Sequence, residues 1–148
     1  MVDRQARNQL AEALRALASG LITNDKFEDR VPRGSKDPAV WSIFTDGAWL
    51  LYSDLKEYRL KGKNALSPEV KHHIARWVLF LRTDKPYEWP RFSRFQTFVF
   101  LLLGLATLGL STRLFRKRYS KRGDIEVWPF ICVPDYEEAL HAPAYLRG

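Results

Sequence analysis

The stretch DRQARNQLAEALRALASG, residues 3–20, decides the fold class because its leucines recur with the period of an α-helix. The spacing predicts a helix over residues 4–18, with Asp3 able to cap its first turn and Gly20 able to end it in a left-handed turn. The apolar stripe consists of Leu10, Leu14 and Leu17 of this helix and of Leu21, three residues past its end.

A second, short helix is expected directly after this first one. Thr23 and Asn24 are both good N-cap residues, and Phe27 would face back toward the first helix. Residues 4–30 therefore predict a helical hairpin.

The residues around this turn also carry a resemblance to a known family. The string LASGLITNDKFE, residues 17–28, locally resembles the SHOCT motif, a two-helix module of many bacterial proteins. That motif has a glycine, two aliphatic residues, a threonine and then an acidic stretch with phenylalanine. The resemblance covers about a fifth of the chain and ends after Glu28, where DRVP replaces the usual lysine and leucine continuation. It implies contact with a protein partner through helices 4–30, rather than catalysis.

A cap residue followed by proline predicts the start of two further helices. Asp and Pro at 37–38 start a helix over residues 38–55, which Gly47 is placed to break into two pieces. Ser and Pro at 67–68 start another over residues 68–82 in the same way. The connection that follows contains two prolines, and we expect its aromatic residues, Tyr87 and Trp89, to pin it to the core.

The C-terminal part is predicted to be less regular. Apolar residues over 125–133 indicate a short extended segment that Pro129 interrupts, and Asp135 suits the cap of a last short helix over 136–140. The fold class is therefore mainly α, with about five helices. We divide the chain into a helical domain over 1–94, a hydrophobic helix over 95–112, and a basic segment and tail over 113–148.

Residues 95–112, FQTFVFLLLGLATLGLST, contain no charged side chain. Eighteen residues lie at the lower limit for crossing a bilayer. Three interpretations stay open: a membrane span, a central helix buried in a bundle walled by helices 4–18, 38–55 and 68–82, or a hairpin that enters one leaflet around Gly104 or Gly109. Lys and Arg are almost equally frequent on both sides of the run, which gives a span no preferred orientation.

The segment 113–122, directly after the uncharged run, holds six basic residues and no acidic one. The whole chain has a net charge of +7 at pH 7 and a pI of about 9.7, which favours anionic partners. The segment suits anionic lipid headgroups, nucleic-acid phosphates, or solvent alone. The candidate anion-binding residues are Arg113, Arg116, Lys117, Arg118, Lys121 and Arg122.

No catalytic, nucleotide-binding or metal-binding motif occurs in the sequence. Adjacent His72 and His73 point in different directions on a helix, so they are poor joint ligands for one metal. The single cysteine, Cys132, lies in an apolar run typical of a small buried side chain, and one cysteine allows no internal disulfide. We predict a non-enzymatic protein without a cofactor.

The sequence does not fix a biological role. The N-terminus has no apolar signal segment, so we expect a protein that is cytoplasmic or associated with the inner membrane, and not secreted. The resemblance of residues 17–28 to the SHOCT motif implies a bacterial protein. We favour a small membrane-associated or interaction protein whose partners are anionic lipid and a protein bound through helices 4–30. The alternative is a soluble helical regulator whose segment 113–122 contacts nucleic acid, a less favoured partner, or an acidic protein.

Overall fold

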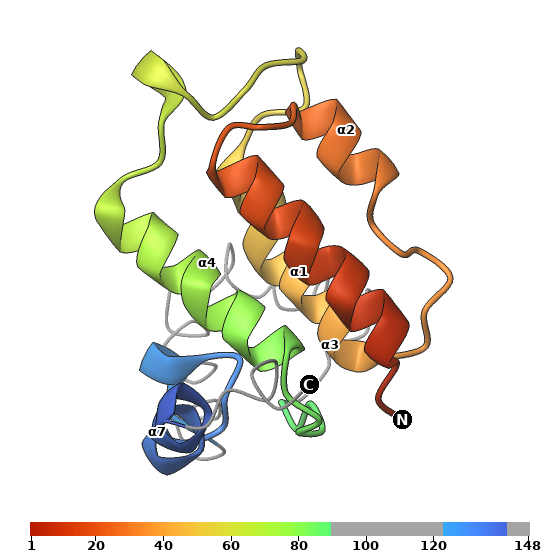
Figure 1. Cartoon of the computed structure of the whole chain (residues 1–148), viewed down its shortest axis with the longest axis vertical. Helices are drawn as coiled ribbons and strands as arrows, with labels where there is room; N and C mark the ends of the chain where they lie inside the picture. Colours follow the sequence, from red (N-terminus) through yellow and green to blue (C-terminus); the bar gives the residue numbers. More distant parts are fainter. Residues whose placement is uncertain (90–122, 142–148) are drawn as a thin grey trace, which may run out of the picture.

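The computed structural model describes residues 1–89 and 123–141, and these residues confirm the mainly helical fold (Figure 1). No strand occurs among them, and their only β-type pairing is an isolated antiparallel bridge between Thr23 and Arg59. The predicted helix over 95–112 lies outside the described residues. The α-helices that are described are α1 (Arg4–Ala18), α2 (Asn24–Asp29), α3 (Pro38–Ser42), α4 (Pro68–Leu81) and α7 (Val133–His141).

The predicted hairpin of residues 4–30 is present as α1 and α2. The Asp3 carboxylate accepts a hydrogen bond from the backbone N–H of Ala6 at 3.0 Å, and Gly20 has a φ of 69°, as its place after the helix requires. Thr23 caps α2 by accepting from the N–H of Lys26. Both ends of the first helix and the start of the second were therefore predicted correctly.

Asn24, the first residue of α2, is completely buried and holds a long loop in place. Its side-chain amide donates to the carbonyl groups of Ser53 and Lys56, at 3.1 and 3.0 Å. Its side-chain oxygen accepts from the N–H of Tyr58 at 2.8 Å. The hairpin therefore organises residues 53–58, which contain no helix of their own.

The helix expected over residues 38–55 is shorter and less regular than predicted. After α3 the chain widens into a π-helical turn, Ile43–Gly47, then tightens into a 3₁₀ turn, Ala48–Leu51, where the helical region ends. Gly47 packs on the indole of Trp77, and a Cβ at this position would lie 3.0 Å from that ring. The change of helix type occurs where α3 meets the bulkiest side chain of α4.

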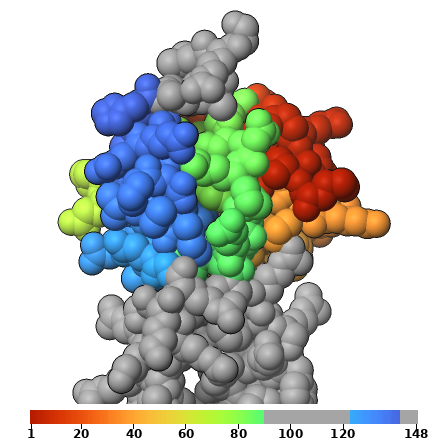
Figure 2. Space-filling model, turned by 90° about the horizontal axis from the view of Figure 1, so that it is seen from below, coloured from red at the N-terminus to blue at the C-terminus, as the bar shows by residue number. Residues whose placement is uncertain are grey.

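The C-terminal residues differ from the expected extended segment. They begin with a 3₁₀ turn, Ile125–Val127, because the Asp124 carboxylate accepts from the N–H of Glu126 at 3.0 Å and starts a turn. The last helix, α7, begins at Val133, before the expected cap Asp135. In Figure 2 these blue residues lie directly against the green end of the N-terminal part.

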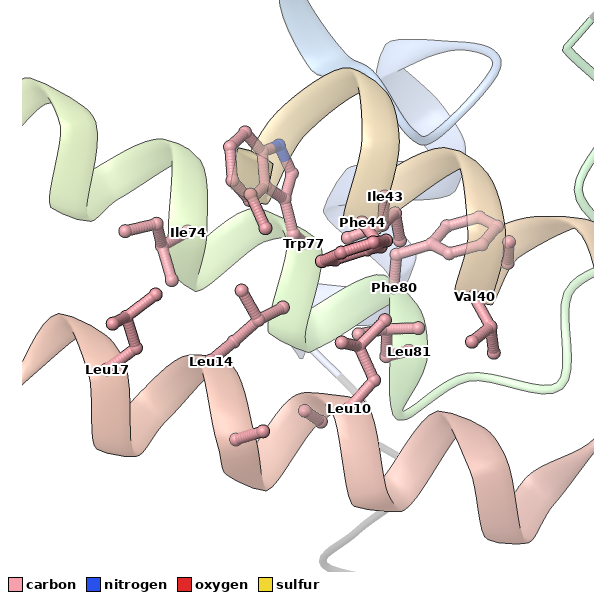
Figure 3. Packing of buried hydrophobic residues seen from close by; sticks show 14 of the residues in the cluster. Leu10, Leu14, Leu17, Val40, Ile43, Phe44, Ile74, Trp77, Phe80 and Leu81 are labelled. Atoms are coloured by element: carbon pink, nitrogen blue, oxygen red, sulfur yellow. The ribbon is translucent and has the colours of Figure 1, made fainter. Parts of the chain in front are cut away.

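The centre of the core is formed where α1, α3 and α4 meet. Leu10, Leu14 and Leu17 of α1 face Ile74, Trp77 and Leu81 of α4, while Val40, Ile43 and Phe44 approach from α3 and its π turn (Figure 3). The three leucines are fully buried and confirm the core face of the helix, but the prediction of Leu21 as part of the stripe was wrong, because the chain turns at Gly20 and leaves Leu21 68 % exposed. Each such side chain contributes about 1.5–3 kcal/mol relative to an exposed one.

A buried ion pair, which the sequence did not reveal, joins one end of this bundle. The side chains of Arg7 and Asp37 are both 0 % exposed, and Arg7 Nε donates to Asp37 Oδ2 at 2.6 Å. Arg7 Nη1 also donates to the carbonyl groups of Thr83 and Lys85, at 3.0 and 2.9 Å. The guanidinium lies 5.3 Å from the ring centre of Phe80. One side chain thus connects the start of α1, the start of α3 and the loop after α4.

The hydrogen bonds around Asp37 decide the direction of its pKa shift. Burial alone would raise the pKa of Asp37, but hydrogen bonds from Arg7 and from the N–H groups of Asp3 and Ala39 outweigh burial and lower it. The unfolded chain therefore binds this proton more readily than the folded one. The stabilisation from Asp37 is present above about pH 4 and is lost as the pH falls through the lowered folded-state pKa.

Replacement of Arg7 by methionine is predicted to destabilise the fold by about 3–5 kcal/mol, because it leaves the Asp37 carboxylate buried without its cation. Urea unfolding at neutral pH measures this change. The matched control is Arg15→Met on the same helix, where the side chain is exposed and a change within about 0.5 kcal/mol is expected. Equal stability of the two variants would contradict the role of the ion pair.

Candidate functional site

The candidate residues of the basic segment, 113–122, and the uncharged run, 95–112, lie outside the described residues, so their roles stay predictions. The structure does describe where the chain enters and leaves this region. Trp89 is the last described residue before it, and Gly123 is the first after it. Any function of the segment depends on how its two ends, Trp89 and Gly123, are joined to the fold.

Trp89 is 3 % exposed and ties the end of the N-terminal part to the C-terminal part. Its indole Nε1 donates to the carbonyl groups of Pro129 and Phe130, at 3.0 and 3.1 Å. The expectation that this tryptophan fastens its loop to the core is confirmed, and the residues that receive it lie 40 positions further along the chain.

Gly123 lies in contact with the same tryptophan. A Cβ added to Gly123 would lie 2.6 Å from the carbonyl oxygen of Ile131 and 3.1 Å from Cη2 of Trp89. The N–H of the next residue, Asp124, donates to that same carbonyl oxygen at 2.9 Å. The two ends of segment 90–122 therefore meet at one place, which we call the junction: Trp89, Gly123, Pro129, Phe130 and Ile131.

Aromatic contacts hold the C-terminal residues on α4. The ring centres of Phe80 and Phe130 are 5.1 Å apart, and those of Trp77 and Trp128 are 5.7 Å apart, both in edge-to-face geometry. Arg76 Nε donates to the carbonyl of Trp128 at 2.8 Å. Residues 1–89 and 123–141 thus share one core.

An ion-pair cluster adds a weaker link at the surface. Lys85 Nζ lies 2.7 Å from Asp135 Oδ1 and 2.7 Å from Glu138 Oε2 of α7. The hydrogen bond to Asp135 raises the pKa of Lys85, and the same bond lowers the pKa of Asp135. The cluster therefore stabilises the docked helix between about pH 4 and pH 10, and its exposure limits the gain to about 1 kcal/mol.

A groove of about 720 Å³ runs between α1 and α4. Three cations border it, and no acidic side chain occurs among the described residues of its lining. One of the cations, Arg82, also lies 3.4 Å from the exposed Glu12 carboxylate. An apolar floor with a basic rim suits an acidic amphipathic segment. The floor is Ala18, Ile74, Ala75, Val78 and Leu79, and the rim is Arg15, Lys71 and Arg82.

An apolar surface is exposed beside the π turn. Trp41 is 47 % and Trp49 41 % exposed, and both rings pack against Phe44, with ring centres 6.0 and 5.6 Å away. Leu50 and Leu55 are more exposed still. Trp41 belongs to α3, Trp49 and Leu50 belong to the 3₁₀ turn, and Leu55 lies beyond the end of the helical region.

Within residues 1–89 and 123–141, no group of three or more His, Cys, Asp and Glu is placed to hold a metal ion. His72 and His73 are exposed, and partial burial followed by the charge of Arg76 lowers the pKa of His73. The Cys132 thiol is half-buried rather than buried, and its Sγ lies 3.2 Å from Asp135 Oδ2.

None of the helices in 1–89 and 123–141 combines the length and the apolarity needed to cross a bilayer. The uncharged run 95–112 is outside that part of the chain.

Comparisons with known proteins give no match. No family model, curated protein or solved structure matches this chain, and the SHOCT-like residues 17–28 match no family model either.

Replacement of Trp89 by phenylalanine is predicted to lower the free energy of unfolding by about 1–3 kcal/mol, because the buried carbonyl groups of Pro129 and Phe130 lose their common donor. Urea unfolding followed by circular dichroism measures the change. Trp49→Phe is the matched control, since that ring is 41 % exposed, and it is expected to stay within about 0.5 kcal/mol of the wild type. An unchanged Trp89→Phe variant would contradict the junction.

Proposed function

We propose that this protein is a non-enzymatic helical protein that attaches to a membrane through residues 95–112, with the basic residues of 113–122 holding anionic headgroups. The observation that carries the proposal is the uncharged run of eighteen residues followed at once by six cations. Apolar side chains supply the affinity for lipid tails, and cations next to them are attracted to the negative surface of the leaflet.

The packing of the described helices supports this choice over a buried role for the run. Leu14 of α1 lies directly against Trp77 and Ile74 of α4, and Phe44 closes the same cluster (Figure 3). Side chains of α1, α4 and the π turn after α3 therefore form a core cluster among the described residues. An uncharged run that this centre does not need is available for lipid.

The length of the basic segment also suits a lipid surface. Each Lys or Arg close to an anionic leaflet contributes about 1 kcal/mol, and this attraction falls off within about 10 Å at moderate salt. Six cations within ten residues of the apolar run can all lie inside that distance. The six cations contribute most to membrane binding where insertion of the apolar run holds them at the lipid surface.

A second candidate is the binding of an acidic protein segment in the groove between α1 and α4. Its basic rim, with no acid among the described lining residues, favours this partner. One of the two helices that line the groove, α1, belongs to the hairpin 4–30 that we expect to bind a protein partner. This function is compatible with membrane attachment, because the groove and the junction involve different residues.

The test is co-sedimentation of the full-length protein with vesicles of neutral lipid and with vesicles that contain phosphatidylglycerol. We expect tighter binding to the anionic vesicles, and a fraction of the protein is expected to stay bound at high salt. The sixfold variant carries glutamine at every candidate position of 113–122. Its partition coefficient for anionic vesicles is expected to fall by at least about tenfold.

A matched control removes the same number of positive charges elsewhere. It replaces six exposed lysines of the described residues by glutamine and is expected to retain most of the binding. Equal losses in both variants would reject the headgroup role, and binding to a DNA duplex in place of vesicles would favour the nucleic-acid alternative. The control positions are Lys26, Lys36, Lys56, Lys61, Lys63 and Lys71.

A further inference from the structure

We infer that the occupant of the groove between α1 and α4 is one α-helix of about three turns with a carboxylate at each end, and that Glu12 competes with that helix for Arg82. This inference rests on the second candidate function and deepens it, because it gives the partner a secondary structure, a charge spacing and a competitor within the chain. It does not depend on attachment to a membrane.

The α4 side of the groove presents one continuous stripe. Lys71, Ala75, Val78 and Arg82 are spaced i, i+4, i+7 and i+11, so they lie on one face of the helix. The two cations stand at the ends of this stripe, about 16 Å apart along the helix axis. A ligand with a single negative group, such as a fatty acid, can pair with one end only. The stripe therefore favours a partner that carries carboxylates at both ends.

The α1 side supplies a third cation between these two ends. The helices lie side by side and antiparallel (Figure 1), and Leu17 of α1 lies beside Ile74 of α4 (Figure 3). Arg15, two residues before Leu17, is therefore at a level between Lys71 and Arg82. Within the described part of the chain, no carboxylate lies within ion-pair distance of Arg15 or Lys71, so both can pair with a partner.

The shape of the groove favours a helix over an extended segment. Ala18 and Ser19 on α1 and Ala75 on α4 line it, and short side chains let a third helix approach both walls closely. A helix returns to the same face after about eleven residues, the interval from Lys71 to Arg82, so it can place two carboxylates and the apolar side chains between them on one face. A strand covers about 16 Å with only about five residues and turns alternate ones away from the floor.

A second copy of the chain fits the groove less well. In a dimer with two-fold symmetry, the same groove of each copy would face the other, and the cations of the two rims would meet. Juxtaposed like charges oppose association. A different protein with an acidic amphipathic helix avoids this conflict.

Arg82 has a weak internal partner in the free protein. Its Nη1 donates to Asn8 Oδ1 at 3.1 Å, and its Nη2 lies 3.4 Å from Glu12 Oε1. This second distance is long for an ion pair and the Glu12 side chain is 71 % exposed, so the pair is weak. A partner carboxylate that reaches Arg82 has to displace Glu12, which therefore lowers the affinity of the groove.

The probe is a fluorescent, alanine-based peptide of about 15 residues, stapled on its outer face so that it stays helical. It carries glutamate at positions i and i+11 and leucine at i+4 and i+7. A control peptide has the same composition with both glutamates moved to the opposite face. Fluorescence polarisation with the full-length protein is expected to show about tenfold tighter binding of the first peptide.

Two matched substitutions locate the binding site. Ala75→Glu places a like charge and a larger side chain in the groove, and it is expected to weaken binding by at least about tenfold. His72→Glu adds the same residue at an exposed position of α4 that is not among the described lining residues, and it is expected to stay within about twofold of the wild type. Glu12→Gln is expected to tighten binding by about two- to fivefold, because Arg82 loses its competitor.

Equal affinity for the two peptides, lost in both with Ala75→Glu, would reject the charge spacing and leave the binding of an acidic segment intact. Binding of neither peptide, or binding that Ala75→Glu does not change, would reject both. Unchanged affinity of the Glu12→Gln variant would overturn the competition, and a dimer of the free protein that Ala75→Glu dissociates would make a second copy the occupant. Wild-type circular dichroism of the variants controls for folding.

Discussion

The closure of the chain at Trp89 and Gly123 is the constraint on which the rest of the molecule depends. An indole shared by two carbonyl groups, 40 and 41 positions away, brings the last described residues before segment 90–122 against the first ones after it. Because of this contact, segment 90–122 is an insertion in one folded unit and not a linker between two units. Any partner of the segment is therefore met from the side on which the unit lies.

The buried ion pair supports this closure through the loop after α4. Arg7 binds Asp37 and also holds the carbonyl groups of Thr83 and Lys85, so it positions the loop that leads to Trp89. A buried ion pair adds little net stability compared with apolar residues of the same volume, but the loss of one partner is costly. Here the pair has a definite role, because Arg7 also satisfies the carbonyl groups of Thr83 and Lys85 in the loop after α4.

The local rules of sequence predicted the helices better than they predicted the contacts between them. Caps at Asp3, Thr23 and Ser67 and the leucine stripe of α1 act within a few residues, so periodicity and cap chemistry located them. The sequence predicted a break at Gly47, where the π turn gives way to the 3₁₀ turn, but the contact of Gly47 with Trp77, 30 positions away, is contained in no local pattern. The burial of Arg7 was missed for the same reason, since an arginine beside an apolar stripe resembles a solvated charge until its partners are known.

In the candidate site too, the local features could be predicted from the sequence and the contacts between distant residues could not. The uncharged run and the basic residues after it are visible in composition alone, whereas their orientation depends on the junction. The most direct measurement of the account is the distance between spin labels at Glu88→Cys and Glu126→Cys, both exposed positions next to the junction, in the Cys132→Ser protein bound to anionic vesicles. The account predicts a distance well below the ~30 Å hydrocarbon thickness and unchanged by vesicle binding. A distance of that thickness or more in the bound state would contradict it.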